Sequence, residues 1–592
     1  MLAVSFPPMA DASTAWAALV PLLMVCRLTR PGPAFRWGFL SGVVFWLATL
    51  YWLLCLGKTG GPWPLVVLGW LLLSGYCAVF MGGFALLVAG LFQRFDRHIE
   101  RKKAEGKDEV RPAALARVGM VFAIPVLWVG FEYLRGVLFT GFPWNALGVS
   151  QYDRTVVIQV AEWGGVYAVS AVVASMNAAI AMMLVRFVDS YRVGQQGRLQ
   201  FDLMAGLLIC ALCWFFGMQR INNLAREKHE YTEVRIGAVQ PNVEQLKKWT
   251  EAFDDYVYGA VRSNTTTMVE YGEPDLAIWP ETAVPGQLSM DPGYCTPVAR
   301  EFVNEMAELG APLLVGVIEM GPGPVIPTAP RLLDDARPDV KAMMMAGELV
   351  VYNSSFLCTT NGIVAGYRKQ HLVPFGEYLP FDKTLTFLQH MAPVGYSCTP
   401  GNSGTVFRLS MGDGKHAAFS TLICFEDIVA PLSRDAVRRG ARMLVNQTND
   451  AWFDGSAGAV QHMTHCVFRC VENRVPAVRC ANTGVTCFID KFGKIDKATR
   501  DRLKLSKTRP LRWKYRMDAL YVEGPEMRLT FYTRYGDLPF AIPCAAASVI
   551  GLVGLGLRRY RQKKLASGGR RTDTVPRAGE SSGSEGKYDR RT

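Results

Sequence analysis

Charged residues are scarce in this sequence. They make up 19% of its 592 residues, against about 25% in an average soluble protein. Half of the residues are hydrophobic and the mean hydropathy is positive, which argues against a fully soluble protein. The apolar residues concentrate on the N-terminal side. Residues 219–537 instead contain a mixture of charged, polar and apolar residues, with Pro and Gly at intervals. We therefore expect a membrane part and a soluble part.

No basic residue precedes the first apolar span, because the chain opens with MLAVSFPPMADAST. A cleavable secretory signal carries a basic segment at that place, so we expect this span to remain in the mature protein. We predict membrane spans from apolar stretches of about 20 residues, of which the first is short and the third is long. They cover residues 14–27, 36–56, 63–92, 116–137, 162–185, 201–218 and 538–557.

The net charge of +13 does not form the continuous basic surface that nucleic acid requires. Basic residues instead gather after the first, third, fifth and last apolar spans, a pattern that places these segments in the cytoplasm. The soluble part then lies outside the cytoplasm, and a solvated charged face is the alternative explanation of the pattern. The topology leaves the N-terminus outside, so we expect a further span upstream that this chain lacks.

These observations predict four regions. Residues 1–218 form a multi-span helical membrane domain, and residues 219–537 form an exported domain with its core at about 233–510. Residues 538–557 form a C-terminal membrane helix. Residues 558–592 are basic and rich in Gly and Ser, so we expect a disordered cytoplasmic tail.

The fourteen cysteines show no repeated spacing, and no recognised zinc pattern is present. His462, Cys466 and Cys470 would share one face of a helix, which leaves metal binding as a remote alternative. We predict no metal and no cofactor. Disulfide pairing among the eight cysteines of the exported domain stays open, because spacing alone does not reveal it.

Short apolar, β-branched runs alternate with helical patterns from about residue 233, and no internal repeat is found. This alternation predicts an α/β domain. The expected strands are 234–240, 275–279, 312–318, 349–360, 416–424, 442–447 and 485–490. The expected helices include 296–310 and 427–440, and the second ends on a Gly suited to a C-cap.

Three reactive residues stand where predicted strands end. Glu281 follows a strand in WPETAVP, Lys369 follows GIVAGY, and Cys424 closes STLIC. Functional residues in α/β domains gather at such ends. A cysteine at its ordinary pKa is mostly a thiol at neutral pH, so a nucleophilic Cys424 needs a base, which Glu281 could supply. Lys369 could stabilise an oxyanion. A Cys–His pair with His371 or His416 stays open.

The order Glu, Lys, Cys resembles the triad of the nitrilase superfamily of carbon-nitrogen hydrolases. The motifs WPETAVP, YRKQHLVPFGEYLP and ICFED resemble most closely those of its membrane branch, the apolipoprotein N-acyltransferases of Gram-negative bacteria. NDAWFDGSAGAVQH, EYLRGVLFTGFPW and VQPNVEQLKKW are also similar, although Asp454 and Gly455 depart from the family pattern. That family commonly has one more N-terminal span, which agrees with the topology above.

The resemblance implies an αββα sandwich, with Glu281 as general base, Lys369 as oxyanion stabiliser and Cys424 as nucleophile. Phe425 stands where the family usually has Tyr, so a hydrogen bond from that hydroxyl is absent here. The resemblance also implies supporting or substrate-contacting roles, which fall on Glu377, Phe425, Glu426, Trp249, Gly141, Trp144, Asn353 and Asn449. For Trp249, Gly141 and Trp144, packing or an interfacial aromatic belt is an equal explanation, and Asn353 and Asn449 are alternatively structural.

The implied reaction moves an acyl chain from a phospholipid to Cys424 as a thioester, and then to the N-terminal amine of a diacylated apolipoprotein. The implied place is the inner membrane of the cell, with the catalytic domain in the periplasm and no nucleic acid among the partners. Segments 138–160 and 385–393 are candidate lids that exclude water from the thioester. Two alternatives stay open: a membrane-anchored amidase that uses the same triad, and a transporter or scaffold without enzymatic activity.

Overall fold

The computed structural model describes residues 1–105, 110–193, 201–226, 230–248, 250–323, 349–379, 397–411, 414–505 and 513–568. Residues 1–548 form one compact unit, which holds both the apolar helices and the α/β domain. Residues 549–592 form a second unit, of which the structure describes the helical residues 549–568.

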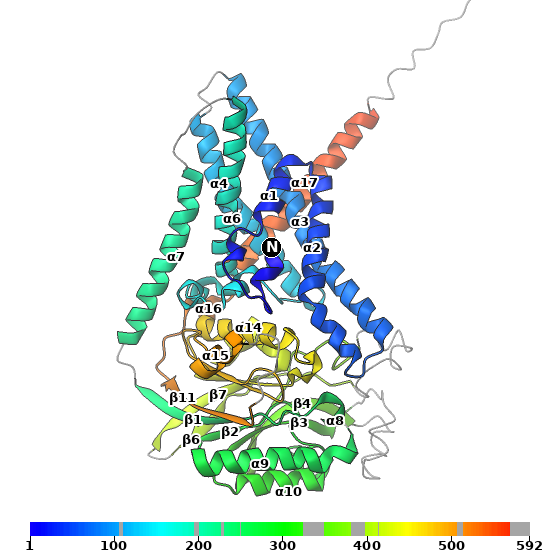
Figure 1. The fold of residues 1–592 in the computed structure, drawn as a ribbon, viewed down its shortest axis with the longest axis vertical. Helices are drawn as coiled ribbons and strands as arrows, with labels where there is room; N and C mark the ends of the chain where they lie inside the picture. Colours follow the sequence, from blue (N-terminus) through cyan, green and yellow to red (C-terminus); the bar gives the residue numbers. More distant parts are fainter. Residues whose placement is uncertain are drawn as a thin grey trace, which may run out of the picture. The chain divides into compact units, whose positions relative to one another are not determined.

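Apolar helices form the N-terminal part of the first unit (Figure 1). Five helices of the described chain are long and apolar enough to cross a membrane, and a sixth candidate is the pair Pro31–Thr49 and Tyr51–Gly57, bent by 50°. The α-helices are α1 (Val20–Leu28), α2 (Pro31–Thr49), α3 (Trp63–Ala104), α4 (Val110–Val137), α6 (Ala161–Val193), α7 (Phe201–Arg226) and α17 (Ala541–Gly568).

The first predicted span, at 14–27, corresponds to a short apolar helical segment at Thr14–Leu28. A 3-10 turn at Thr14–Trp16 precedes α1, which has nine residues and begins beside Pro21. Nine residues rise about 14 Å in an α-helix, and the hydrocarbon core of a bilayer is about 30 Å thick. The third span is longer than predicted, since α3 continues through the basic residues to Ala104. Helix α6 is broken at Gly164 and Gly165.

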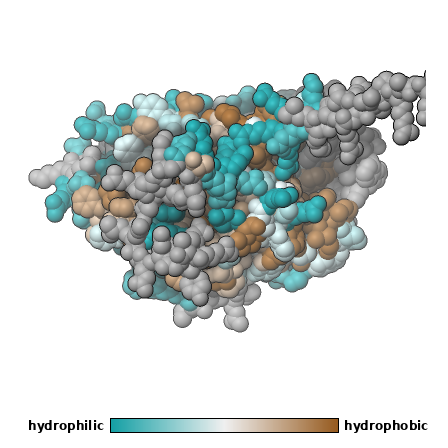
Figure 2. All heavy atoms as spheres, turned by 90° about the horizontal axis from the view of Figure 1, so that it is seen from above, coloured by the Kyte–Doolittle hydropathy of each residue, from teal (hydrophilic) through white to brown (hydrophobic). Residues whose placement is uncertain are grey.

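Figure 2 views the molecule from above, and hydrophilic residues form a band across the middle of this face with hydrophobic residues on either side. The exposed basic residues at the end of α3 include Arg94, Arg97 and Arg101. This distribution is expected where a helix continues beyond an apolar span into water.

Two β-sheets make up the α/β domain. The larger has the strand order β11-β1-β2-β3-β4-β5, and the smaller has the order β10-β9-β8-β7-β6. Strands β1, β2 and β3 run parallel to one another, as do β7, β8 and β9. The outer strands of both sheets pair antiparallel with these central strands or with each other. The strands are β1 (Tyr231–Val239), β2 (Leu276–Ile278), β3 (Leu313–Pro322), β4 (Leu349–Thr359), β5 (Gly362–Arg368), β6 (Phe407–Ser410), β7 (His416–Ile423), β8 (Met443–Thr448), β9 (Ala477–Ala481), β10 (Cys487–Ile489) and β11 (Tyr515–Glu523).

The two sheets pack against each other and are covered by helices on both outer faces. Their facing strands share a core that includes Ile236, Phe419 and Val445. Helices α9 (Asp254–Gly272) and α10 (Pro297–Ala307) cover the larger sheet, and α13 (Ala430–Arg438) and α14 (Gly458–Asn473) cover the smaller one (Figure 1). This is the expected αββα sandwich, so the predicted fold class is confirmed.

All seven predicted strands are present. Strand β5 matches the run GIVAGY that precedes Lys369, whereas β6, β9 and β11 were not predicted, and β9 holds an Arg in place of an uninterrupted apolar run. Arg479 in β9 is fully buried among charged partners, so its burial gives no hydrophobic signal in the sequence.

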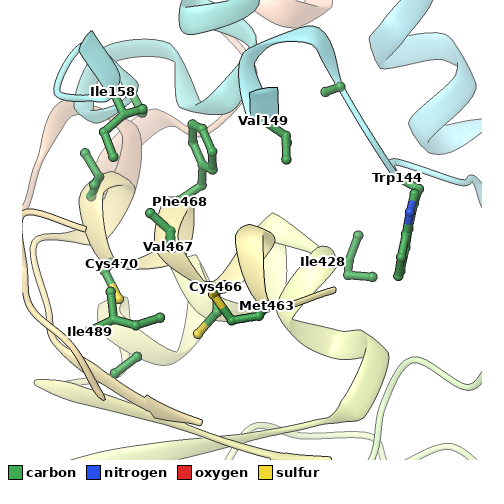
Figure 3. Close-up of a cluster of buried hydrophobic side chains, with 14 of the residues drawn as sticks. Trp144, Val149, Ile158, Ile428, Met463, Cys466, Val467, Phe468, Cys470 and Ile489 are labelled. Atoms are coloured by element: carbon green, nitrogen blue, oxygen red, sulfur yellow. The ribbon is translucent and has the colours of Figure 1, made fainter. Parts of the chain in front are cut away.

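The α14 layer and the apolar N-terminal part share one hydrophobic core. Figure 3 shows Trp144, Val149 and Ile158 facing the side chains of α14, including Met463 and Phe468. The segment between α4 and α6 therefore lies directly on the α/β domain. This packing brings the membrane part to the end of β7, where Cys424 stands.

Candidate functional site

Cys424 lies at a sharp turn that follows strand β7. It starts a 3-10 turn, Cys424–Ile428, and has a φ of 54°. A residue other than glycine rarely adopts this left-handed conformation, and such strain is typical of functional turns. The carbonyl oxygen of Cys424 accepts a hydrogen bond from Asn446 Nδ2 at 3.0 Å, which helps to hold the turn.

Lys369, Glu281 and Glu377 form a buried charged group. Lys369 Nζ lies 2.8 Å from Glu377 Oε1 and 3.7 Å from Glu281 Oε1, and Lys369 is 1% exposed. Asn353 Nδ2 donates to both carboxylates at 2.8 Å, so it bridges them. Burial lowers the pKa of Lys369, but Glu377 and Glu281 outweigh burial and raise it above its ordinary value. The ammonium therefore stays charged.

Glu426 ties the loop that carries Lys369 to the turn that carries Cys424. Its carboxylate accepts hydrogen bonds from the backbone N–H groups of Ile423 at 2.7 Å, Gln370 at 2.7 Å and His371 at 3.0 Å. The Tyr367 hydroxyl donates to it at 2.9 Å. One buried side chain thereby sets the spacing of two reactive residues.

The Cys424 thiol is held in its protonated form. Burial and the Glu281 carboxylate raise its pKa, and the Lys369 ammonium opposes this shift only in part. Glu281 and Lys369 thus both act on the sulfur. Because the thiolate is the nucleophile, this arrangement requires a base that takes the proton during the attack. Glu281 is the carboxylate with the largest influence on the thiol.

The ring of Phe425, next to Cys424, packs on aromatic rings from the segment between α4 and α6. The Phe425 ring lies nearly parallel to Trp144, with centroids 6.3 Å apart, and to His371, at 6.0 Å. Trp144 is 1% exposed, and its Nε1 donates to Gln461 Oε1 at 2.8 Å. Gly141 has a φ of 77°, and a Cβ there would collide with the carbonyl oxygen of Gly136. Its role is to let the chain turn toward Trp144.

Lys248 is a second buried lysine at this site, and the sequence analysis missed it. Its Nζ donates to the carbonyl oxygen of Glu281 at 2.8 Å. Burial lowers its pKa to about 8, although the charges of Glu281 and Cys424 favour the ammonium. The surrounding sequence, QLKKW, is typical of lysines exposed to solvent, so only the burial of Lys248 in the structure distinguishes it.

The remaining predicted residues lie at different places. Asn449 donates to Gln245 Oε1 at 2.7 Å and accepts from Asn482 at 2.9 Å, so it holds loops together. Trp249 and the candidate lid at 385–393 lie outside the described residues.

His416 stands at the start of β7, and Cys424 follows the end of the same strand. At about 3.3 Å per residue, the two residues are about 26 Å apart. That distance excludes direct pairing of His416 with Cys424.

The structure gives no support to the remote metal alternative. Within the described ranges, no group of three or more His, Cys, Asp and Glu side chains is arranged to hold a metal ion. His462 instead contacts Asp427 and Asp450, each at 3.0 Å. The structure shows no disulfide among the fourteen cysteines, all of which lie within the described residues.

The two parts of the chain match two family models. Residues 1–179 match the apolipoprotein N-acyltransferase N-terminal domain, and residues 235–504 match the carbon-nitrogen hydrolase family. Among solved structures, the chain is similar to Nit3 of Saccharomyces cerevisiae, a member of branch 10 of the nitrilase superfamily, with a TM-score of 0.31 and 14% identity over 52% of this chain and 95% of that one. An amidase from Nesterenkonia sp. gives a TM-score of 0.30 and 17% identity, over 51% and 95%.

Full-length relatives are similar over nearly the whole chain. The apolipoprotein N-acyltransferase of Geobacter metallireducens is 32% identical over 94% of each chain. That of Chlorobaculum tepidum is 29% identical over 94% of this chain and 95% of its own. The apolar helices and these relatives together identify a membrane protein. With matched models in both parts and such coverage, the chain belongs to the apolipoprotein N-acyltransferase family.

Proposed function

We propose that this acyltransferase moves an acyl group from a phospholipid to Cys424, and from there to the α-amine of a diacylglyceryl-cysteine lipoprotein. The single observation that carries the proposal is the position of Cys424. It stands on a strained turn between a buried Glu–Lys pair and an aromatic layer that belongs to the membrane part.

In the first half-reaction, Glu281 takes the thiol proton while the sulfur attacks an ester carbonyl of the phospholipid. The carbonyl oxygen becomes an anion, and the Lys369 ammonium donates to it. A donor at this place is worth about 3 to 4 kcal/mol. The carbon–oxygen bond then breaks, Glu281 returns the proton to the leaving oxygen, and a lysophospholipid departs from a thioester on Cys424.

In the second half-reaction, the α-amine of the lipoprotein attacks the thioester carbonyl. Glu281 accepts a proton from the amine and passes it to the departing sulfur, so that an amide and the free thiol result. The enzyme ends in its starting state, and ping-pong kinetics follow from the covalent intermediate. The chemistry of both steps uses only side chains of this chain.

Three features of the structure support this distribution of roles. Glu377 and Asn353 fix Lys369 and Glu281 relative to each other. Glu426 fixes the Lys369 loop against the Cys424 turn. The third is the Phe425 and Trp144 layer, which supplies an apolar border where a lipid chain avoids a cost of about 0.8 kcal/mol per exposed CH₂.

We further propose that the protein lies in the inner membrane with its α/β domain in the periplasm. The basic residues after the first, third, fifth and last apolar segments support this orientation through the positive-inside rule. The same orientation divides the chain into a membrane domain at 1–218, an exported domain at 219–537, a C-terminal membrane span at 538–557 and a tail at 558–592. Helix α17 continues beyond this span to Gly568.

Intact mass spectrometry of the full-length protein tests the proposal. After incubation with phospholipid, we expect a mass increase of one acyl group that Cys424→Ala lacks, and a diacylated lipopeptide with a free amine should remove it. Release of free fatty acid without N-acylated lipopeptide would favour an amidase. An unmodified, fully functional Cys424→Ala protein would favour a transporter or scaffold.

A further inference from the structure

Four charged or titratable side chains are buried together behind the nucleophile: Asp427, Asp450, His462 and Arg479. None is more than 2% exposed. Arg479 contacts Asp427 at 2.7 Å and Asp450 at 3.0 Å. His462 contacts the same two carboxylates: its Nε2 lies 3.0 Å from Asp427 Oδ1, and its Nδ1 lies 3.0 Å from Asp450 Oδ1. Buried charges are costly unless they are paired, and one guanidinium with one imidazolium balances two carboxylates. The cluster is therefore a closed unit.

His462 connects this cluster to the nucleophile. Its Nε2 lies 3.2 Å from the carbonyl oxygen of Cys424. Asn446 Nδ2 contacts the same oxygen at 3.0 Å, so two donors converge on the backbone of the catalytic cysteine. This carbonyl belongs to the residue whose φ is 54°. A strained conformation persists only where its surroundings hold it in place.

We infer that His462 is a positioning residue: its Nε2–H group holds the Cys424 carbonyl and thereby keeps the sulfur aimed at Glu281 and Lys369. The inference rests on the proposed function of Cys424. The contact of His462 with Cys424 is to the backbone carbonyl oxygen, so His462 acts through that backbone. The cluster of charges serves to hold the imidazole.

The surroundings of the ring fix its orientation. Asp450 Oδ1 lies 3.0 Å from Nδ1, and the ring stacks on Trp144 with centroids 5.8 Å apart. Burial and the Arg479 charge oppose protonation, but the carboxylates of Asp427 and Asp450 outweigh them and raise the pKa of His462. A protonated imidazole carries a hydrogen on both nitrogens. The Nε2 hydrogen then lies between the Cys424 carbonyl oxygen, at 3.2 Å from Nε2, and Asp427 Oδ1, at 3.0 Å.

His465 offers a matched control on the same helix. It is 3% exposed and packs on the same Trp144 ring, with centroids 5.5 Å apart. Its Nε2 has no hydrogen-bond partner among the described residues. A change at His465 therefore disturbs α14 to a similar degree and leaves the Cys424 carbonyl untouched.

The test compares His462→Gln, His462→Asn and His465→Gln in the full-length protein. Gln places its amide N–H near the position of Nε2, whereas the shorter Asn does not reach it. Single-turnover mass spectrometry measures how fast the acyl adduct forms and how fast a lipopeptide amine removes it. We expect His462→Asn to slow both half-reactions about a hundredfold, because a small misplacement of a reacting group has that effect. The phospholipid concentration at half-maximal rate should not change.

His462→Gln should recover most of the lost rate, and His465→Gln should react at the wild-type rate. Wild-type rates in His462→Asn would overturn the inference. It would also be overturned if His462→Gln were as slow as His462→Asn and both melted well below His465→Gln, since that pattern indicates a purely structural role. If the wild-type protein itself forms no adduct, the proposed function fails instead, which keeps the two failures distinct.

Discussion

Removing the Lys369 ammonium separates its two contributions, one to stability and one to catalysis. Lys369 is 1% exposed and lies between two carboxylates, at 2.8 Å from Glu377 and 3.7 Å from Glu281. Lys369→Met would leave both carboxylates with neutral donors alone, Asn353 Nδ2 to each of them and the Val373 N–H to Glu377, and with no cation between them. We expect this variant to lose stability as well as activity.

The size of the stability loss follows from the charges. Two unit charges about 5 Å apart repel by about 3 kcal/mol at an effective dielectric constant of about 20. Removing one partner of a buried ion pair costs about 3 to 5 kcal/mol in other proteins. We therefore expect the free energy of unfolding of Lys369→Met to fall by about 3 to 5 kcal/mol, unless one carboxylate takes up a proton.

The second variant adds Glu377→Gln to Lys369→Met. It restores the charge balance, so its unfolding free energy should return to within about 1 kcal/mol of the wild-type value. Its acylation rate should stay about a hundred to a thousandfold low, because the donor to the oxyanion is still missing. Thermal and denaturant unfolding in detergent measure the first quantity, and single-turnover acyl-adduct formation measures the second.

Two results would refute this reasoning. If the double variant were as unstable as Lys369→Met, the ammonium would not compensate Glu377. If the double variant formed the adduct at the wild-type rate, Lys369 would not stabilise the oxyanion. Glu377→Gln alone is the matched control, since it removes the same carboxylate and keeps the ammonium.

Three further variants test the surroundings of Cys424. Phe425→Tyr should form the adduct at the wild-type rate. Phe425→Leu should be about tenfold slower, because it loses the stacked contacts with Phe142, Trp144 and His371, and aromatic pairs are worth about 0.5 to 1.5 kcal/mol each. Equal rates in the two variants would contradict this. Glu426→Gln should lower the unfolding free energy by about 2 to 3 kcal/mol, as one charge-assisted acceptor is lost, and an unchanged melting temperature would contradict it. Lys248 has its pKa lowered to about 8 by burial, so the folded protein binds fewer protons than the unfolded chain between about pH 8 and pH 10.5. Over that range the wild-type protein should gain up to about 3 kcal/mol of stability relative to Lys248→Met, and parallel pH profiles in thermal unfolding would refute the assignment.

The order of the reactive residues could be predicted because each follows a recognisable strand. Glu281, Lys369 and Cys424 stand after apolar runs. Buried strands of an α/β domain consist largely of apolar residues, so these runs predict strands. The apolar spans could be predicted for the same reason, since a bilayer requires about 20 apolar residues whatever the tertiary packing. The αββα arrangement came from the family resemblance rather than from periodicity.

Only the tertiary structure revealed what holds these residues in place. Lys248, His462 and Arg479 look like solvated or metal-binding residues in the sequence, yet all three are buried and paired. A buried charge gives no periodic signal, because its partners come from strands and helices far away in the chain. Within the apolar segment at Thr14–Leu28, the regular helix α1 covers nine residues and begins beside Pro21, since Pro is tolerated in the first turn of a helix. The sequence by itself determined which reactive side chains are available to the site. The pairing of charges from distant parts of the chain determined how those side chains are positioned.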